Sequence, residues 1–328
     1  MITEFFFDDT FFSSAYLSDI NLSVVHDLFL SNWIDYGVLV YPAGYLIRYD
    51  AAINALPVKY QAQWKAALAH GKKVSTEIPW KDIDLLTDFE EALKSYSRYF
   101  STAFVDDTLA YVLCGNGNIS RHCKSTNFEV VGAPAITQSE NFKRSTVFSK
   151  QDIAGASNIN TVWNDRFKML AKHSKRITIC DRFLFERILD DVARGVHSSI
   201  KNFLDFLVVE DGDYYLTIFS DGGGMGSEQK IEIENYFSTL FKPATGYSAK
   251  VKRLTLISNE KKIFQQFSHD RYVRFDDYVC ALGNGLTIFE RNPISNTTVS
   301  IKLKPFTNAD AIEKALRDDP LWCDVPIS

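Results

Sequence analysis

The sequence lacks any uninterrupted apolar run of the ~18 residues that a membrane-spanning helix needs. Residues 1–12 also lack the basic region and small-residue cleavage pattern of a secretory signal. The five cysteines are widely scattered and form no Cys-x-x-Cys pair, so neither a disulfide framework nor a structural zinc site is indicated. These absences predict a cytoplasmic protein with reduced thiols, no transmembrane segment, no bound metal and no other cofactor.

The composition is that of an ordered globular protein. Of the 328 residues, 46% are hydrophobic and 23% are charged, and a chain of this length is usually divided into two domains. A net charge of −5 argues against a protein that wraps nucleic acid through its overall charge. Any nucleic-acid site is therefore expected to be local.

A candidate domain boundary lies between residues 132 and 160, where large apolar side chains are few and Ser, Asn, Gly, Thr and Lys are frequent. This composition is typical of a connector. We predict an N-terminal α/β domain of unknown role over residues 1–145, a second domain over 155–305, and a C-terminal helix and tail over 306–328.

Both halves have the apolar patterns of an α/β protein. In the first half, short strands are predicted at residues 4–7, 37–41 and 104–105, and a helix at 85–100. In the second half, helical patterns at 184–207 and 231–240 alternate with strand-like runs at 176–180, 214–219, 253–257, 271–275, 278–282 and 299–303. This order favours a mixed sheet flanked by helices.

One constellation in the second half carries chemistry. His269, Arg271 and Asp276 occur at offsets 0, 2 and 7, and Gly283 and Asn284 follow seven and eight residues after the aspartate. Residues two apart on a strand share a face, so His269 and Arg271 are expected to point at one ligand.

The constellation resembles the phospholipase D superfamily motif His-x-Lys-x4-Asp-x6-Gly-(Ser/Asn), with Arg271 at the lysine position. It is most similar to the phospholipase-D-like C-terminal domain of MIT-domain proteins, whose Ile-x-Ile-x-Asp strand corresponds to Ile177-Thr-Ile-Cys-Asp181. That likeness covers residues 163–304. The resemblance to the superfamily motif implies that His269 is a nucleophile or anchor, that Arg271 stabilises phosphate oxygens without metal, and that Asp276 orients the imidazole.

Catalysis and binding without turnover both stay open under this resemblance. Arginine keeps the positive charge of the family lysine but has a different shape. Active sites of the superfamily join two such motifs, and this chain has one, because His173-Ser-Lys175 is followed by Asp181 one residue too late. A symmetric homodimer could supply the second histidine.

Basic residues surround the motif and suit a phosphate ligand. From this neighbourhood we predict that Arg274, Asn284 and Lys252 contribute to phosphate binding. A glycine-rich loop, Ser220-Asp-Gly-Gly-Gly-Met-Gly-Ser227, lies between a predicted strand and helix but lacks the Gly-Lys-(Ser/Thr) ending of a P-loop. We interpret it as a flexible loop.

A separate hypothesis concerns the first half. Pairs of carboxylates, Asp8 with Asp9 and Asp106 with Asp107, follow apolar runs, and Glu90 with Glu91 lies on a predicted helix. PIN-like nucleases assemble a Mg²⁺ site from carboxylates at strand ends. The alternative is a structural role, in which these acidic residues lie at the beginnings of helices.

The leading hypothesis is phosphodiester recognition by the second domain, with or without metal-independent phosphodiesterase or nuclease action. The alternative is a non-catalytic adaptor that binds nucleic acid, anionic lipid or a protein partner, and the third is the PIN-like nuclease. Bacterial proteins that combine an unfamiliar module with a phospholipase-D-like domain often belong to antiviral defence loci, which is an analogy of architecture.

Overall fold

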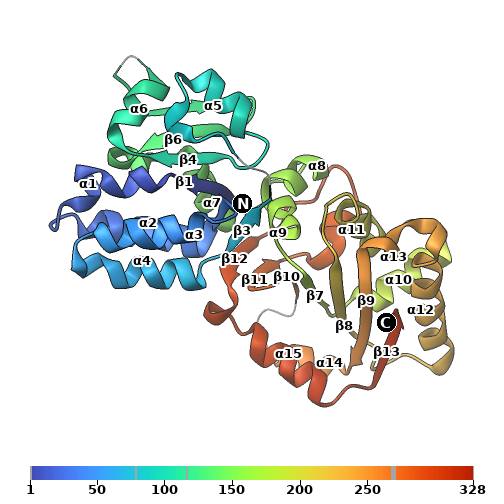
Figure 1. Ribbon diagram of the computed structural model, residues 1–328. Coiled ribbons are helices and arrows are strands. Elements are labelled where there is room, and N and C mark those ends of the chain that lie inside the picture. Colours follow the sequence, from blue (N-terminus) through green and yellow to red (C-terminus); the bar gives the residue numbers. More distant parts are fainter. Residues whose placement is uncertain (1, 78–79, 116, 267–270, 328) are drawn as a thin grey trace. The chain divides into compact units, whose positions relative to one another are not determined.

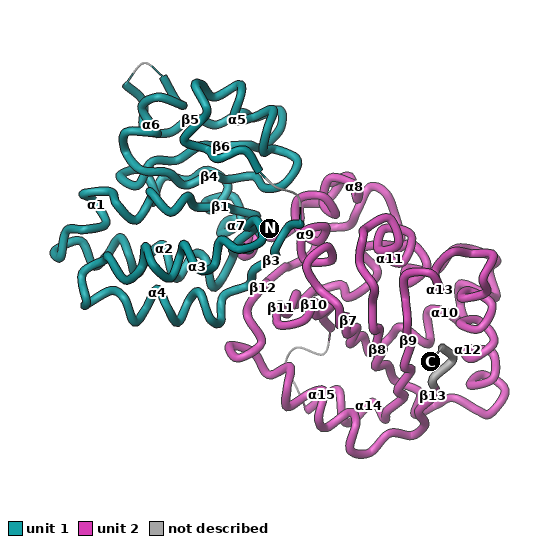
Figure 2. The backbone as a smooth tube through the Cα atoms, in the orientation of Figure 1, with its two compact units in different colours: residues 1–147 teal, residues 148–328 magenta. Residues whose placement is uncertain are grey.

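The computed structural model describes residues 2–77, 80–115, 117–266 and 271–327, with side chains as far as Asp324 in the last strand. The chain forms two compact units, Met1–Val147 and Phe148–Ser328 (Figures 1 and 2). Each unit is a mixed β-sheet flanked by helices, which confirms the predicted α/β class.

Unit 1 is built on a six-stranded sheet with the order β3-β2-β1-β4-β6-β5. Its strands are β1 (Thr3–Phe7), β2 (Gly37–Pro42), β3 (Lys73–Thr76), β4 (Thr102–Val105), β5 (Ser120–Cys123) and β6 (Phe128–Gly132). All neighbours are parallel except β5 and β6. β1 and β4 are buried along their whole length, which agrees with the apolar residues that dominate both segments of the sequence.

Helices connect and cover these strands. They are α1 (Ala15–Ser18), α2 (Ser23–Tyr36), α3 (Tyr45–Ala55), α4 (Val58–His70), α5 (Phe89–Tyr96), α6 (Asp107–Cys114) and α7 (Glu140–Lys150), with 3-10 turns at Asp9–Ser13, Ile83–Leu85 and Ala133–Gln138. Aromatic rings fill the core, as where Phe7 packs on Tyr49 with 4.4 Å between ring centroids.

The first part of the segment predicted as a connector is helical, in the turn at Ala133–Gln138 and in α7, while residues 151–158 contain no helix. The boundary between the units falls inside α7 rather than in an irregular linker. Several small polar residues of this segment are buried and hydrogen-bonded. Asn141 donates to the carbonyls of Ser101 and Asn127, and Ser139 donates to the Glu129 carboxylate. Composition alone cannot distinguish such residues from solvated ones.

Unit 2 is built on a seven-stranded sheet with the order β12-β11-β10-β7-β8-β9-β13. Its strands are β7 (Arg176–Asp181), β8 (Tyr214–Asp221), β9 (Val251–Asn259), β10 (Arg271–Phe275), β11 (Tyr278–Leu282), β12 (Val299–Leu303) and β13 (Trp322–Ile327). β7, β8 and β9 are parallel, and the outer strands are antiparallel to their neighbours.

Helices lie on both faces of this sheet (Figure 1). They are α8 (Ile159–Val162), α9 (Lys168–Lys172), α10 (Leu184–Arg194), α11 (Ser199–Leu207), α12 (Ser227–Leu240), α13 (Tyr247–Lys250), α14 (Lys261–Gln265) and α15 (Ala309–Asp318), with a π-helical turn at Trp163–Phe167 and 3-10 turns at Pro243–Thr245, Gly285–Phe289 and Lys304–Phe306. α14 and α15 pack on the buried face that includes Cys180 and Phe219.

Two predictions for unit 2 needed correction. The helical pattern at 184–207 is two helices, because Gly195 adopts a left-handed conformation (φ 66°) that ends α10, and Ser198 caps α11 by accepting from the N–H of Lys201. The predicted C-terminal tail is not separate from the domain, since α15 is packed in its core and β13 pairs with β9.

Candidate functional site

The carboxyl ends of the three parallel strands of unit 2 meet at one edge of the sheet. β7 ends at Asp181, β8 at Asp221 and β9 at Asn259. The antiparallel strand β10 begins at this edge, with Arg271 directly opposite Asp181. β11 returns along β10, with Ala281 opposite Tyr272. The hairpin therefore brings Arg271 and the Gly283–Asn284 part of the motif to the same edge, where open α/β sheets bind ligands.

Asp181 is the buried centre of this edge. Its side chain is 1% exposed, and it accepts hydrogen bonds from the backbone N–H groups of Phe183 (3.1 Å) and Leu286 (2.8 Å). Arg187 lies 3.4 Å from its Oδ2 atom. Burial raises the pKa of the Asp181 carboxyl, and the positive charges of Arg187 and Arg271 oppose that rise.

The sequence prediction did not include Asp181 among the site residues. Its signal was present, because an aspartate ends a strongly apolar strand, yet that pattern alone does not show which side chain the carboxylate meets. The register of β7 and β10 shows which side chain it meets. Opposite residues of an antiparallel pair point to the same face, so Asp181 lies beside Arg271.

Gly285 allows this approach. Its φ of +59° is in the left-handed region, and a Cβ there would lie 2.2 Å from Oδ2 of Asp181 and 3.1 Å from Cδ of Arg271. A side chain at position 285 would therefore displace the buried Asp181 carboxyl and crowd Arg271. Steric crowding by Asp181 therefore explains why glycine is required at position 285, which the motif by itself did not reveal.

Arg271 is partly exposed, and its guanidinium carbon lies 5.9 Å from the centre of the Phe183 ring. Asn284 is held by its surroundings: its backbone N–H donates to Thr297 Oγ1 (3.0 Å), and its amide Nδ2 donates to the Asn296 carbonyl (3.0 Å). His269, the predicted nucleophile, lies outside the described residues.

Asp276 lies at the opposite end of β10 from Arg271. Five residues of strand separate them by roughly 16 Å. Asp276 occupies the β10–β11 turn with φ +46°, and its carboxylate accepts hydrogen bonds from the backbone N–H groups of Arg176 (2.9 Å) and Lys175 (3.2 Å). This placement assigns Asp276 to anchoring the hairpin on β7 and corrects its predicted role of orienting an imidazole beside Arg271.

Arg274 does not face the edge either. Its guanidinium makes two bonds to the Glu313 carboxylate, at 2.5 and 2.8 Å, and a third to Thr178 Oγ1 at 2.7 Å. The side chains of Arg274 and Glu313 are 9% and 4% exposed. Arg274 therefore joins α15 to the sheet, and its predicted phosphate contact is corrected to a structural one.

Lys252 is near the beginning of β9, about seven residues and roughly 23 Å along the strand from the edge where Asn259 ends it. It lies 3.4 Å from Asp213 and donates to the carbonyl of Ala249. The basic neighbourhood seen in the sequence is thus divided, with Lys261 and Lys262 at the carboxyl edge and Lys252 at the other edge.

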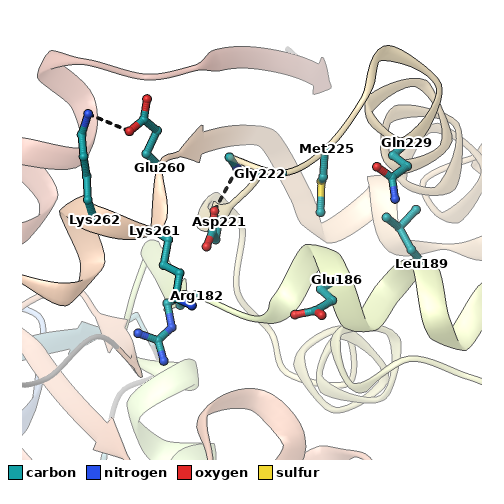
Figure 3. A pocket seen from close by; sticks show the side chains of 12 residues that line it. Arg182, Glu186, Leu189, Asp221, Gly222, Met225, Gln229, Glu260, Lys261 and Lys262 are labelled. Atoms are coloured by element: carbon teal, nitrogen blue, oxygen red, sulfur yellow. Dashed lines mark hydrogen bonds and ion pairs between the residues drawn. The ribbon is translucent and has the colours of Figure 1, made fainter.

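A pocket of about 550 Å³ opens over the ends of β7, β8 and β9 (Figure 3). Charged side chains of both signs line it, namely Arg182, Lys261, Lys262, Glu186, Asp221 and Glu260. Gly222, Gly223 and Gly224 of the glycine-rich loop form part of its wall. The loop interpreted from sequence as merely flexible therefore borders a cavity.

The carboxylates of unit 1 have structural partners. Asp9 pairs with Arg48 (2.8 Å), Glu90 with Arg121 (2.8 Å) and Glu91 with Lys81 (2.5 Å). Asp106 caps α6, and Asp107 accepts from Ser14. Asp8 accepts from Thr10, and burial raises the pKa of its carboxyl to about 6. Among the described residues, no group of three His, Cys, Asp or Glu side chains could hold a metal ion.

No described helix has the length and apolar character needed to cross a membrane. No family model matches this sequence, and no curated protein matches it. Among solved structures, phosphatidylserine synthase from Haemophilus influenzae Rd KW20 is similar to the chain, with a TM-score of 0.28 and 16% identity. The match covers 53% of this chain and 38% of that chain, so this chain spans well under half of that protein's length. A similarity this low carries no argument about activity.

Proposed function

We propose that unit 2 recognises a phosphodiester at the carboxyl edge of its sheet, with Arg271 as the phosphate clamp and His269 as the nucleophile or anchor. The observation that carries this proposal is the β10–β11 hairpin, which brings Arg271 and Asn284 to the edge where β7 and β8 end. In sequence these residues resemble the phosphate-handling motif of the phospholipase D superfamily.

The surroundings of Arg271 support phosphate binding. The buried Asp181 side chain lies opposite Arg271 across the β7–β10 pair. A guanidinium can donate two parallel hydrogen bonds to phosphate oxygens. Asp181 is itself held by two backbone N–H groups, so a carboxyl in a fixed position borders the guanidinium that we propose as the clamp.

In the catalytic form of the proposal, the His269 imidazole attacks phosphorus and the P–O bond to the leaving alcohol breaks. The leaving oxygen takes a proton from a general acid, and water then cleaves the P–N bond, restoring the histidine and releasing a phosphomonoester. Such a route needs no metal ion. The second histidine of a symmetric homodimer is the proposed general acid.

The test measures binding and cleavage of labelled single-stranded DNA, RNA and bis(p-nitrophenyl) phosphate in EDTA. Wild type is compared with His269→Ala, Arg271→Ala and Arg271→Lys. We expect Arg271→Ala to weaken binding at least tenfold, about 1.4 kcal/mol, because a charged hydrogen-bond donor is lost. Arg271→Lys keeps the charge but loses the two-pronged geometry, so an intermediate affinity is expected.

Arg253→Ala is the matched control, because Arg253 is an exposed arginine near the beginning of β9, at the other edge of the sheet. It should leave binding unchanged. EDTA-resistant cleavage that disappears in His269→Ala supports turnover, and binding without cleavage supports the adaptor alternative. Vesicles containing phosphatidylserine test the lipid arm. Binding that is insensitive to Arg271→Ala overturns the proposal, and cleavage that requires Mg²⁺ but not His269 assigns the activity to unit 1.

A further inference from the structure

The pocket over the strand ends lies directly beside the proposed phosphate site. β7 separates β10, which carries Arg271, from β8, which ends at Asp221. Neighbouring strands are about 4.8 Å apart, so the ends of β10 and β8 are about 10 Å from each other. Asp181 faces Arg271, and the next residue, Arg182, lines the pocket. A group joined to a phosphate at Arg271 could therefore enter it.

The charges of the pocket balance. Three carboxylates oppose three cations along the wall, and Glu260 and Lys262 already pair with each other at 2.7 Å. Glu186 and Lys261 make no hydrogen bond or ion pair with any residue that the structure describes, which leaves one acceptor and one donor free for a ligand. Asp221 accepts only the N–H of Gly223 within the described chain, at 2.9 Å.

Because carboxylates and cations are equally numerous in the pocket wall, a second phosphate group is not the ligand that fits it best. A further anion would lie against Glu186 and Asp221, which carry negative charge into the same cavity. A neutral group that bears N–H donors as well as acceptors matches these side chains better, because carboxylates accept from amino groups while Lys261 donates to carbonyl or ring nitrogen atoms.

The volume of the pocket and the chemistry of its wall narrow the class of ligand that it can bind. A volume of about 550 Å³ falls in the range of pockets that enclose a drug-sized ligand, ~300–1,000 Å³, and is far larger than a small amino alcohol requires. Leu189 and Met225 supply apolar walls beside Gln229 (Figure 3), an arrangement suited to a flat ring. A lipid chain would require a more continuous apolar lining than these two side chains provide.

We propose that this pocket receives the nucleoside attached to the bound phosphodiester, and that Glu186 and Asp221 accept hydrogen bonds from the amino-bearing edge of its base. The inference rests on the proposed function, because the phosphate is placed at Arg271. It makes the substrate class nucleotidic and assigns base preference to a wall of the pocket rather than to the phosphate clamp.

The experiment is calorimetric titration of the full chain with adenosine, cytidine, guanosine and uridine 5′-monophosphates, with ribose 5-phosphate as the probe without a base. We expect the amino-bearing nucleotides to bind about tenfold more tightly than ribose 5-phosphate, the effect of one charge-assisted hydrogen bond. Uridine monophosphate, whose base has no amino group, should show less of this gain.

Two variants test whether the wall of the pocket determines the base preference. Glu186→Ala should reduce the tenfold preference and leave the affinity for ribose 5-phosphate unchanged, and Met225→Trp, which narrows the cavity, should do the same. Glu232→Ala is the matched control, because Glu232 is an exposed glutamate of α12 that does not line the pocket. Nucleotides that bind no better than ribose 5-phosphate overturn the inference.

Failure of the proposed function has a different signature. Arg271→Ala should weaken every phosphorylated probe, including ribose 5-phosphate. Suppose that free nucleosides bind in a way that depends on Glu186, and that the affinity for phosphorylated probes is unchanged in Arg271→Ala. This result would overturn the phosphodiester function while supporting a nucleoside pocket. No binding of any probe overturns both.

Discussion

Arg274 and Glu313 form an ion pair that is almost entirely removed from solvent, and at the scale of single residues this pair fixes α15 on the sheet. Removing Arg274 would leave the buried Glu313 carboxylate with only the half-exposed Arg317, at 3.4 Å, as a positive partner. The geometry also explains why a basic residue beside the motif is not available to a ligand.

We expect Arg274→Ala to lower the free energy of unfolding by about 3–5 kcal/mol, the usual cost of breaking a buried pair. Arg317→Ala is the control, since Arg317 lies 3.4 Å from the same carboxylate but is 49% exposed, and it should cost under about 1 kcal/mol. Urea unfolding measures both. Equal effects of the two substitutions would contradict the structural role assigned to Arg274.

Asp8 makes the stability of unit 1 depend on pH. Burial raises its pKa from 3.8 to about 6 in the folded state, so between these values the folded chain binds more protons than the unfolded chain. The free energy of unfolding therefore falls as pH rises through this window, by about 3 kcal/mol in total. Above pH 6 the buried Asp8 carboxylate is charged, and the free energy of unfolding has fallen by the full amount.

Asp8→Asn removes the titrating group and keeps an acceptor for Thr10. Relative to wild type, this variant should gain stability steadily from pH 4 to pH 6 and then stay level. Asp50→Asn, at an exposed position of α3, should show no such trend. Chemical unfolding at several pH values measures the difference, and a wild-type-minus-variant curve that is flat across the window would contradict this prediction.

At the scale of elements, the segment after β11 is shaped by a glycine that packs on the end of β7. Gly285 combines a positive φ with close approach to Asp181, whereas Gly195, at the end of α10, has a similar φ of +66° and open space around it. The two glycines separate the cost of backbone strain from the cost of a steric clash.

Gly195→Ala should cost about 1 kcal/mol, because only the backbone conformation is disfavoured. Gly285→Ala should cost about 3 kcal/mol, since the added methyl group also displaces the Asp181 carboxylate. It should weaken phosphodiester binding as well, because Asp181 lies beside Arg271. Thermal unfolding and the binding assay measure these effects. If Gly285→Ala behaves like Gly195→Ala in both, the packing described around Asp181 is wrong.

At the scale of the whole molecule, each unit has its own sheet and its own buried core. Ile53 of α3 and Leu316 of α15 are both fully buried, one in each unit. We therefore expect the two units to unfold as separate cooperative transitions.

Ile53→Ala and Leu316→Ala should each lower the stability of one unit by about 2–5 kcal/mol. In differential scanning calorimetry, each substitution should shift a different transition and leave the other in place. Leu321→Ala, at a position that is 46% exposed, is the control for the loss of a leucine side chain. A single transition shifted equally by Ile53→Ala and Leu316→Ala would show that the chain unfolds as one body.

The amino-acid sequence by itself determined the α/β class and many of the strands and helices. Buried strands such as β1 and β7 are rich in apolar residues, and the strands of the β10–β11 hairpin are recognisable in the same way. The spacing of the motif also placed Arg271 on a strand with Asn284 beyond its return. These are local properties, because periodicity and turn chemistry depend on neighbouring residues.

Only the tertiary structure decided which end of a strand each polar residue occupies and what it meets there. Asp276 belongs to the motif and Lys252 is near it in sequence, but both lie at the other edge of the sheet, while Arg274 is bound to Glu313, 39 residues away. Asp181 and the glycine-rich loop became site features through strand register and order. Hydrogen bonds and burial between distant segments have no local signal, since packing alone brings them together.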